Sequence, residues 1–356
     1  MNLIKHRLLH WLSATALTLG SITAQADTEL KHWPPEAATQ LKALIQANAN
    51  KGAFAVFDAD NTSYRYDLEE SLLPFLEMKG VLTRQKLDAS LKLIPFKDVA
   101  GHTESLNSYY YRLCEVDDQV CYPWVAQVFA GFTLKELKGY VDELMAYGKP
   151  IPATYYEGDA VKTIEISPPK LYTGQQELYN ALLENGIEVY VMSAASEELV
   201  RMVLADPKYG YNVKPQNVIG VSLLLKDRKS GSVTTARKLV AEKKYDPAAL
   251  MDHELTPYLW APATWFEGKQ AAIYTYIDEW KKPILVAGDT PVSDGPMLFR
   301  GTDIEHGGLR VWVNRKDKYL KQIQAMQQKN AAAQKAQGQP VTADKNWIVV
   351  KPEQIQ

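Results

Sequence analysis

Two aspartates, one residue apart, stand where a predicted strand ends. The run Phe54–Phe57 is apolar and rich in β-forming residues, which is typical of a strand buried in a parallel sheet. Asp58 and Asp60 follow it directly, and Thr62 comes two residues later. If the backbone turns just after Asp58, the two carboxylates converge and favour a divalent cation between them. The alternative is an ordinary turn, because Asp and Asn are frequent turn residues, and this stretch alone favours neither interpretation.

Polar side chains also follow two later predicted strands. They are Ser193 after Glu188–Met192, and Asp289 and Asp294 after Pro283–Ala287. Lys269 lies at the front of the predicted helix that precedes the second of these strands. In a doubly wound sheet such strand ends open on one edge. The set then offers carboxylates for a cation, with a hydroxyl and an ammonium for an anion, and an anion that also needs a divalent cation is most simply a phosphate ester.

The elements that must position these residues alternate between helix and strand. Helices are predicted for 27–51, 64–82, 175–185, 197–204 and 270–280, a hairpin for 218–235, and further strands for 309–313 and 347–350. A markedly aromatic, mostly helical region interrupts this order, and Thr133 with Glu136 forms a predicted capping box in it. The predicted fold is therefore α/β, a Rossmann-like doubly wound parallel sheet. Its core is formed by 27–63 and 168–356, and a mainly helical cap domain by 64–167.

Length and charge narrow the function classes. The chain has 356 residues, 46% of them hydrophobic, and a formal net charge of -2. This length is enough for two domains. The absence of a basic excess argues against a nucleic-acid partner. The tail at 316–339 is rich in Gln, Ala and Lys and predicts a solvated helix without a function of its own.

The first 26 residues have the pattern of a secretory signal peptide. A positive start with Lys5 and Arg7 is followed by an apolar segment, and Ala24 and Ala26 are the small residues that a signal peptidase reads. We expect cleavage after Ala26 and a periplasmic or secreted protein. A retained membrane anchor is the alternative; the cleavage site opposes it, and so does the lack of a later apolar run of about 20 residues. The protein is thus expected to have no membrane partner once the signal is removed.

The chain has two cysteines, Cys114 and Cys121, separated by a short polar segment. In an exported protein such a pair favours a disulfide. The alternative, a two-cysteine metal site, would need further ligands nearby, and the six histidines are scattered.

The order of these motifs resembles the haloacid dehalogenase superfamily of phosphohydrolases. The resemblance covers most of the expected mature chain, and its specific parts are the segments 58–62 and 288–294. It implies that Asp58 is the nucleophile that forms an aspartyl-phosphate, and that Asp60 is the general acid and then the base. Dehalogenases of the superfamily lack an acid at the position of Asp60, which favours a phosphatase. The resemblance also implies that the inserted cap selects the substrate.

The same resemblance assigns the remaining motif residues. Thr62, Ser193 and Lys269 would hold the phosphoryl oxygens. Mg²⁺ would be bound by Asp58, the backbone carbonyl of Asp60, Asp289 and Asp294; other divalent cations such as Zn²⁺ are also compatible with such ligands. Phosphoryl transfer depends mainly on positioning and charge neutralisation, so losing any one of these groups should lower the rate by orders of magnitude.

The export signal and the motif spacing are similar to those of bacterial periplasmic phosphorylcholine phosphatases. In that family a carboxylate after the first motif and tyrosines of the cap hold the quaternary ammonium. Glu70 matches the carboxylate, and Tyr110 and Tyr111 match the tyrosines. Where the family has an acid beside them, the corresponding residues Asn107, Ser108 and Tyr109 are neutral. Trimethylammonium groups prefer aromatic faces, each contributing roughly 0.5–2 kcal/mol. The competing interpretations are a solvated acid at Glu70 and cap-core packing for the tyrosines.

Three functions follow as hypotheses. The first is a Mg²⁺-dependent phosphomonoesterase for phosphorylcholine or a similar small amine phosphate. The second is a broader phosphatase for phosphoserine, phosphoethanolamine or sugar phosphates. The third is a non-catalytic binding protein for choline or betaine. The intact acids, Ser193 and Lys269 argue against the third, because degraded relatives of an enzyme tend to lose the nucleophile first.

Overall fold

The computed structural model describes residues 29–99 and 101–356. The predicted signal peptide, residues 1–26, lies outside the described residues. Among the residues that are described, no helix is both long and apolar enough to span a bilayer.

The core is a six-stranded sheet in which all neighbouring strands are parallel, in the order β13-β12-β11-β1-β6-β7. Its strands are β1 (Phe54–Phe57), β6 (Glu188–Ser196), β7 (Val218–Val221), β11 (Leu285–Gly288), β12 (Leu309–Val313) and β13 (Trp347–Val350). In register, Phe57 pairs with both Val191 and Ala287. The carboxyl ends of β1, β6 and β11 therefore meet at one edge, as predicted. Ser193 was predicted to follow its strand, but β6 continues to Ser196 and includes it.

Both faces of this sheet are covered, and the alternation along β1 shows why. Phe54 and Val56 pack on one apolar cluster, and Ala55 and Phe57 pack on the other. The helices of the core are α1 (Pro35–Asn48), α6 (Thr173–Glu184), α7 (Glu197–Leu204), α8 (Ala236–Ala241), α9 (Glu267–Tyr276), α10 (Pro291–Pro296) and α11 (Asp317–Ala336). This confirms the predicted doubly wound α/β core.

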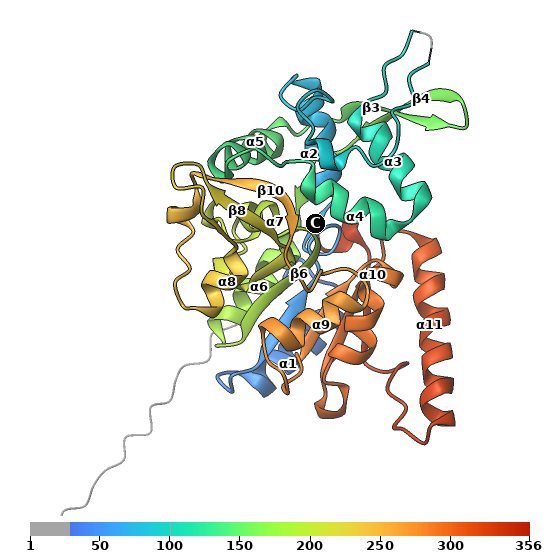
Figure 1. The fold of residues 1–356 in the computed structure, drawn as a ribbon. Coiled ribbons are helices and arrows are strands. Elements are labelled where there is room, and N and C mark those ends of the chain that lie inside the picture. Colours follow the sequence, from blue (N-terminus) through green and yellow to red (C-terminus); the bar gives the residue numbers. More distant parts are fainter. Residues whose placement is uncertain (1–28, 100) are drawn as a thin grey trace, which may run out of the picture.

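The cap combines helices with a strand pair that the sequence analysis did not predict. Its helices are α2 (Leu68–Met78), α3 (Leu106–Val116), α4 (Asp118–Gln127) and α5 (Leu134–Tyr147), and its antiparallel hairpin is β3 (Ile151–Glu157) with β4 (Ala160–Ile166). Figure 1 shows these elements gathered at one end of the molecule, above the core. The capping box of Thr133 and Glu136 opens α5, as predicted. Cys114 and Cys121 form the predicted disulfide between α3 and α4.

Short elements complete the chain. Two strands, β2 (Tyr64–Arg65) and β5 (Lys170–Leu171), pair where the chain enters and leaves the cap. A side sheet contains β8 (Leu223–Asp227), β9 (Val233–Thr234) and β10 (His253–Leu259). The predicted hairpin at 218–235 is thus only partly right, because its first residues form β7 of the main sheet. The single turns are η1 (Ala89–Leu91), η2 (Pro207–Tyr209), η3 (Pro215–Asn217), η4 (Ala248–Leu250), the π-helical η5 (Met297–Gly301), η6 (Ile304–His306) and η7 (Pro352–Gln354).

Candidate active site

The chain turns sharply after β1, and this turn brings Asp58 and Asp60 to one cavity. The N–H of Asp58 still donates to the Ala287 carbonyl of β11 at 3.0 Å. Asn61 then adopts a φ of 61°, a left-handed conformation that Asn tolerates better than most residues. Asp58 and Asp60 both line a cavity of about 240 Å³ between cap and core. The predicted turn after Asp58 is therefore present.

The Asp60 carboxylate faces the start of the cap. Its Oδ1 accepts a hydrogen bond from the N–H of Leu68 at 2.8 Å. Burial, reinforced by the nearby charge of Asp67, raises the pKa of Asp60 well above its usual value. A carboxyl that holds its proton in this way suits a general acid. The arrangement fits the predicted role of Asp60.

Hydrogen bonds connect Asp294 to Asp289 in the segment that follows β11. The Asp294 carboxylate accepts hydrogen bonds from the N–H groups of Asp289 and Thr290, both at 2.9 Å. Gly288 permits this close approach, because a Cβ there would lie 2.7 Å from the Cβ of Asp294. The last motif is thereby folded back on itself with both acids buried.

Three buried carboxylates form a cluster. Oxygen atoms of Asp58, Asp289 and Asp294 all lie within 4.8 Å of one another. Burial, followed by the charge of Asp294, raises the pKa of Asp58. An all-oxygen set of this charge fits a hard divalent cation, which would neutralise the acids and polarise phosphoryl oxygens when bound. The side chain of Asp60 is not in this cluster, and the predicted ligand at Asp60 is its backbone carbonyl.

Lys269 is a buried cation that contacts two of these acids. Its Nζ lies 2.5 Å from Asp58 Oδ1 and 2.7 Å from Asp294 Oδ1, and the side chain is 1% exposed. Burial alone would lower the pKa of Lys269, but the Asp294 and Asp58 charges outweigh it and raise that pKa above its ordinary value. Lys269 is therefore a permanent positive charge beside the candidate nucleophile.

Ser193 and Thr62, whose hydroxyls were predicted to bind phosphate, differ in their position relative to the cavity. Ser193 lines the cavity, as expected for a residue that contacts a phosphoryl oxygen. Thr62 does not line it: its side chain is fully buried, and its Oγ1 donates to Asp289 Oδ1 at 3.0 Å. In this structure the Thr62 hydroxyl therefore contacts a carboxylate of the acidic cluster, and its predicted contact with phosphate stays a prediction.

The predicted head-group residues lie in the cap wall of the cavity. Glu70 and Tyr110 both line it, and the Tyr110 hydroxyl donates to Glu70 Oε1 at 3.1 Å. The Tyr110 ring stacks on Trp124 with centroids 6.3 Å apart. Tyr111 packs beside Tyr110 but does not line the cavity. The structure thus brings Glu70 and Tyr110 to the site and leaves Tyr111 behind them.

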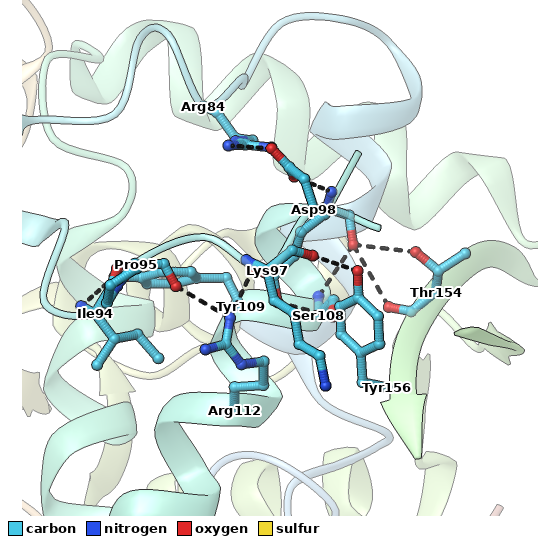
Figure 2. Close-up of polar contacts among 12 residues, drawn as sticks. Arg84, Ile94, Pro95, Lys97, Asp98, Ser108, Tyr109, Arg112, Thr154 and Tyr156 are labelled. Atoms are coloured by element: carbon cyan, nitrogen blue, oxygen red, sulfur yellow. Dashed lines mark hydrogen bonds and ion pairs between the residues drawn. The ribbon is translucent and has the colours of Figure 1, made fainter. Parts of the chain in front are cut away.

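Tyr109, one of the three neutral residues where the family was expected to have an acid, does not line the cavity. Its hydroxyl donates to the Ile94 carbonyl at 2.9 Å and accepts from the Ile94 N–H at 2.8 Å. Figure 2 shows it within the polar network of the outer cap, beside the Arg112 contact to Pro95 and the Tyr156 contact to Lys97. Tyr109 therefore supports the loop at 94–98.

Several residues that sequence reasoning missed also line the cavity. Among them are Asp67, Tyr122, Arg315 and Tyr319. Asp67 also caps α2 by accepting from the N–H of Glu70 at 2.9 Å. Arg315 forms an ion pair with Asp289. Its position two residues after the end of β12 was the one available signal, because the strand-end rule applies to β12 as well.

Comparisons with known proteins agree with this geometry. A phosphorylcholine phosphatase of Pseudomonas aeruginosa PAO1 is 72% identical over 342 residues, which cover 96% of this chain and 97% of the relative. A solved structure of a conserved protein of unknown function from Anaerococcus prevotii matches with a TM-score of 0.57 and 19% identity, over 83% of this chain and 90% of that one. The second match shows likeness of fold alone. No protein-family model matches the chain.

Proposed function

This chain belongs to the family of bacterial phosphorylcholine phosphatases, within the haloacid dehalogenase superfamily, and from that premise we propose its substrate and mechanism. The proposed reaction is hydrolysis of phosphorylcholine to choline and inorganic phosphate. The observation that carries the proposal is one cavity that has Asp58, Asp60, Ser193 and Lys269 on its core side and Glu70 with Tyr110 on its cap side.

In the first step a carboxylate oxygen of Asp58 attacks phosphorus, and the bond from phosphorus to the choline oxygen breaks. Asp60 gives its proton to that leaving oxygen. In the second step Asp60, now a carboxylate, takes a proton from water, the water oxygen attacks phosphorus, and Asp58 is released. Lys269 and Ser193 hold the phosphoryl oxygens in both steps, which supplies the positioning on which phosphoryl transfer depends.

Mg²⁺ is the proposed cofactor, with Zn²⁺ as another divalent cation that such ligands accept. Asp58, Asp289 and Asp294 would hold it together with the Asp60 carbonyl. The support is the cluster of buried carboxylate oxygens and the lack of sulfur or imidazole in it.

Glu70 and Tyr110 are proposed to receive the trimethylammonium group. A carboxylate beside an aromatic face attracts a quaternary ammonium. The name of the 72% identical relative supports the same substrate. A broader phosphatase remains the second candidate, because Asn107, Ser108 and Tyr109 are neutral where the resemblance predicts an acid.

The substrate is tested by comparing kcat/KM for phosphorylcholine and phosphoethanolamine. Removing methyl groups from the ammonium weakens its contact with apolar and aromatic surfaces, so we expect phosphorylcholine to be favoured by about tenfold or more. Equal values would contradict the head-group site while leaving the phosphatase intact. Asp58→Asn is the control that should release no phosphate from either ester, and a wild-type protein inactive on both would instead favour a binding protein.

We also propose that the protein is exported to the periplasm. The pattern of residues 1–26 and the disulfide between Cys114 and Cys121 support an oxidising compartment. Determining the N-terminal residue of the protein purified from the periplasmic fraction tests this, and Asp27 is the expected first residue.

A further inference from the structure

Arg315 occupies the outer side of the acidic cluster, where the proposed function assigns it no role. It follows β12 directly after Asn314 and lines the catalytic cavity. Its Nε forms an ion pair with Asp289 Oδ2, and its Nη2 donates to Thr290 Oγ1 at 3.1 Å. The guanidinium therefore makes a two-point contact with the end of β11.

Both oxygens of Asp289 are engaged in this arrangement. Oδ1 accepts from Thr62 at 3.0 Å, and Oδ2 accepts from Thr290 at 3.0 Å and from Arg315. Of these donors Arg315 alone carries a positive charge, so it opposes a divalent cation that takes an Asp289 oxygen as a ligand. Carboxylate oxygens that face a guanidinium are poor ligands until that positive charge has moved away.

Arg315 is a more accessible partner of Asp289 than Thr62. Its side chain is 21% exposed and lies on a loop, whereas Thr62 is fully buried in the turn after β1. A second cavity, of about 310 Å³, adjoins the first and is also lined by Arg315. The guanidinium thus has neighbouring space to enter when it releases Asp289.

Lys269 differs from Arg315 in this respect. It is 1% exposed and bridges Asp58 and Asp294, so two carboxylates hold it, whereas one holds Arg315. The cluster of three acids is therefore balanced by one fixed cation and one exchangeable cation.

We propose that Arg315 is an internal cation that holds Asp289 in the metal-free protein, competes with the divalent cation for that carboxylate, and so sets the affinity of the site. The inference rests on the cation site of the proposed function. It predicts that Arg315 weakens cation binding, which is the opposite of what a residue that merely supports the site would do.

The test is calorimetric titration of Mg²⁺ into substrate-free protein. Arg315→Gln should lower the Mg²⁺ dissociation constant by about tenfold or more, which is the scale of one hydrogen bond to a charged group. Lys316→Gln is the matched control, because it removes the same charge from the same cavity but Lys316 makes no contact with Asp289. Lys316 is exposed, so its removal should change the constant by less than about threefold.

A second readout is thermal stability. In EDTA, Arg315→Gln should melt below wild type, and saturating Mg²⁺ should raise its melting temperature more than that of wild type. Arg315→Lys keeps the charge and loses the two-point contact, so it should bind Mg²⁺ with intermediate affinity. If Arg315→Gln does not fold, Arg315→Lys still tests the proposal.

An unchanged or weaker Mg²⁺ affinity in both Arg315 variants would overturn the inference. Equal tightening in Arg315→Gln and Lys316→Gln would also overturn it, since the effect would then be the net charge of the cavity. If neither wild type nor any variant bound a divalent cation, the cation site itself would be wrong, which distinguishes that failure from the failure of the competition.

Discussion

At the scale of residues, the cavity is dominated by carboxylates that the fold has made hard to ionise. Asp60, Glu69 and Glu70 all have pKa values raised mainly by burial. When several of these carboxyl groups are ionised, their negative charges repel one another. A bound cation, either a metal ion or a quaternary ammonium, would reduce this repulsion. This chemistry matches a substrate that carries an ammonium group at one end and needs a divalent cation at the other.

Asp67 provides a prediction about pH. Burial, with the Glu70 charge beside it, raises the pKa of Asp67 to about 7. An unfolded Asp titrates near pH 4, so between about pH 4 and pH 7 the folded protein holds this proton and the unfolded chain does not. Raising the pH through that window should therefore lower the free energy of unfolding.

Asp67→Asn isolates this effect, because Asn keeps the oxygen that caps α2 but cannot titrate. Urea unfolding in EDTA at about pH 5 and about pH 7 measures the difference. We expect wild type to lose more stability than the variant over this interval. The same loss in both proteins would show that Asp67 is not the titrating group.

The sequence predicted that Asp58, Asp60, Ser193 and Asp289 lie together because each comes shortly after a visibly apolar run. Tyr122 could not be found in this way. It reaches the cavity from α4, and only the packing of the cap on the core decides which of the many cap tyrosines faces inward. Thr62 was placed in the right turn, but the direction of its hydroxyl depends on Asp289, which is 227 residues away.

At the scale of elements, a single loop before α9 contacts both Ser193 and Lys269, the two residues proposed to hold the phosphoryl oxygens. The Thr264 hydroxyl donates to the Ser193 carbonyl at 2.5 Å, and the N–H of Lys269 donates to the Phe266 carbonyl at 3.1 Å. Phe266 has a φ of 52° and a ψ of -129°, a strained conformation for a bulky residue. Strain of this kind is maintained where the surrounding structure fixes a functional group, here Lys269.

Gly268 provides a prediction for this loop. A Cβ at Gly268 would lie 1.9 Å from the Ala263 carbonyl oxygen, so the start of α9 would have to move. Gly268→Ala should lower the free energy of unfolding by about 1–3 kcal/mol and kcat by roughly 10–100-fold. Urea unfolding and phosphate release measure the two effects.

Gly139→Ala is the control for the change in residue type. A Cβ at Gly139 would meet nothing within 4 Å, and the residue lies inside α5. Helix propensity should make this variant more stable by about 0.5–1 kcal/mol with kcat unchanged. Similar losses in both variants would refute the positioning role of the loop.

Helices were predicted where α1, α6, α7 and α9 lie, and the capping box identified the start of α5. The short helices α8 and α10 were not predicted. The hairpin β3–β4 was not predicted, since β4 is mostly exposed and lacks the alternation of a half-buried strand. The strand β10 was missed because it is paired only with β8 and contacts the cap at Thr133. These residues form a strand because of contacts with distant parts of the chain, which the local sequence pattern does not show.

At the scale of the whole molecule, the C-terminal residues 353–356 contact the two segments that connect the cap to the core. Arg65 in β2 donates to Glu353 and Gln356, both at 3.0 Å. The N–H of Gly174, at the start of α6, donates to the Ile355 carbonyl at 2.9 Å. The last residues therefore bind both segments that connect the cap to the core.

Ile355 provides the corresponding prediction. Its side chain is fully buried, so Ile355→Ala should lower the free energy of unfolding by about 2–5 kcal/mol. Val349→Ala is the control, because Val349 is 48% exposed and should lose less than about 1 kcal/mol. Chemical denaturation of both variants measures the difference, and equal losses would show that the C-terminal segment does not contribute in this way.

The central claim is that Asp58 carries the phosphoryl group during hydrolysis. The most direct test is to quench wild-type protein with acid during turnover of phosphorylcholine with Mg²⁺ and to locate phosphorylated peptides by mass spectrometry. We predict a phosphoryl group on Asp58 that disappears once the substrate is exhausted. Sustained phosphate release without any phosphorylated Asp58, or with the group on another residue, would contradict this account.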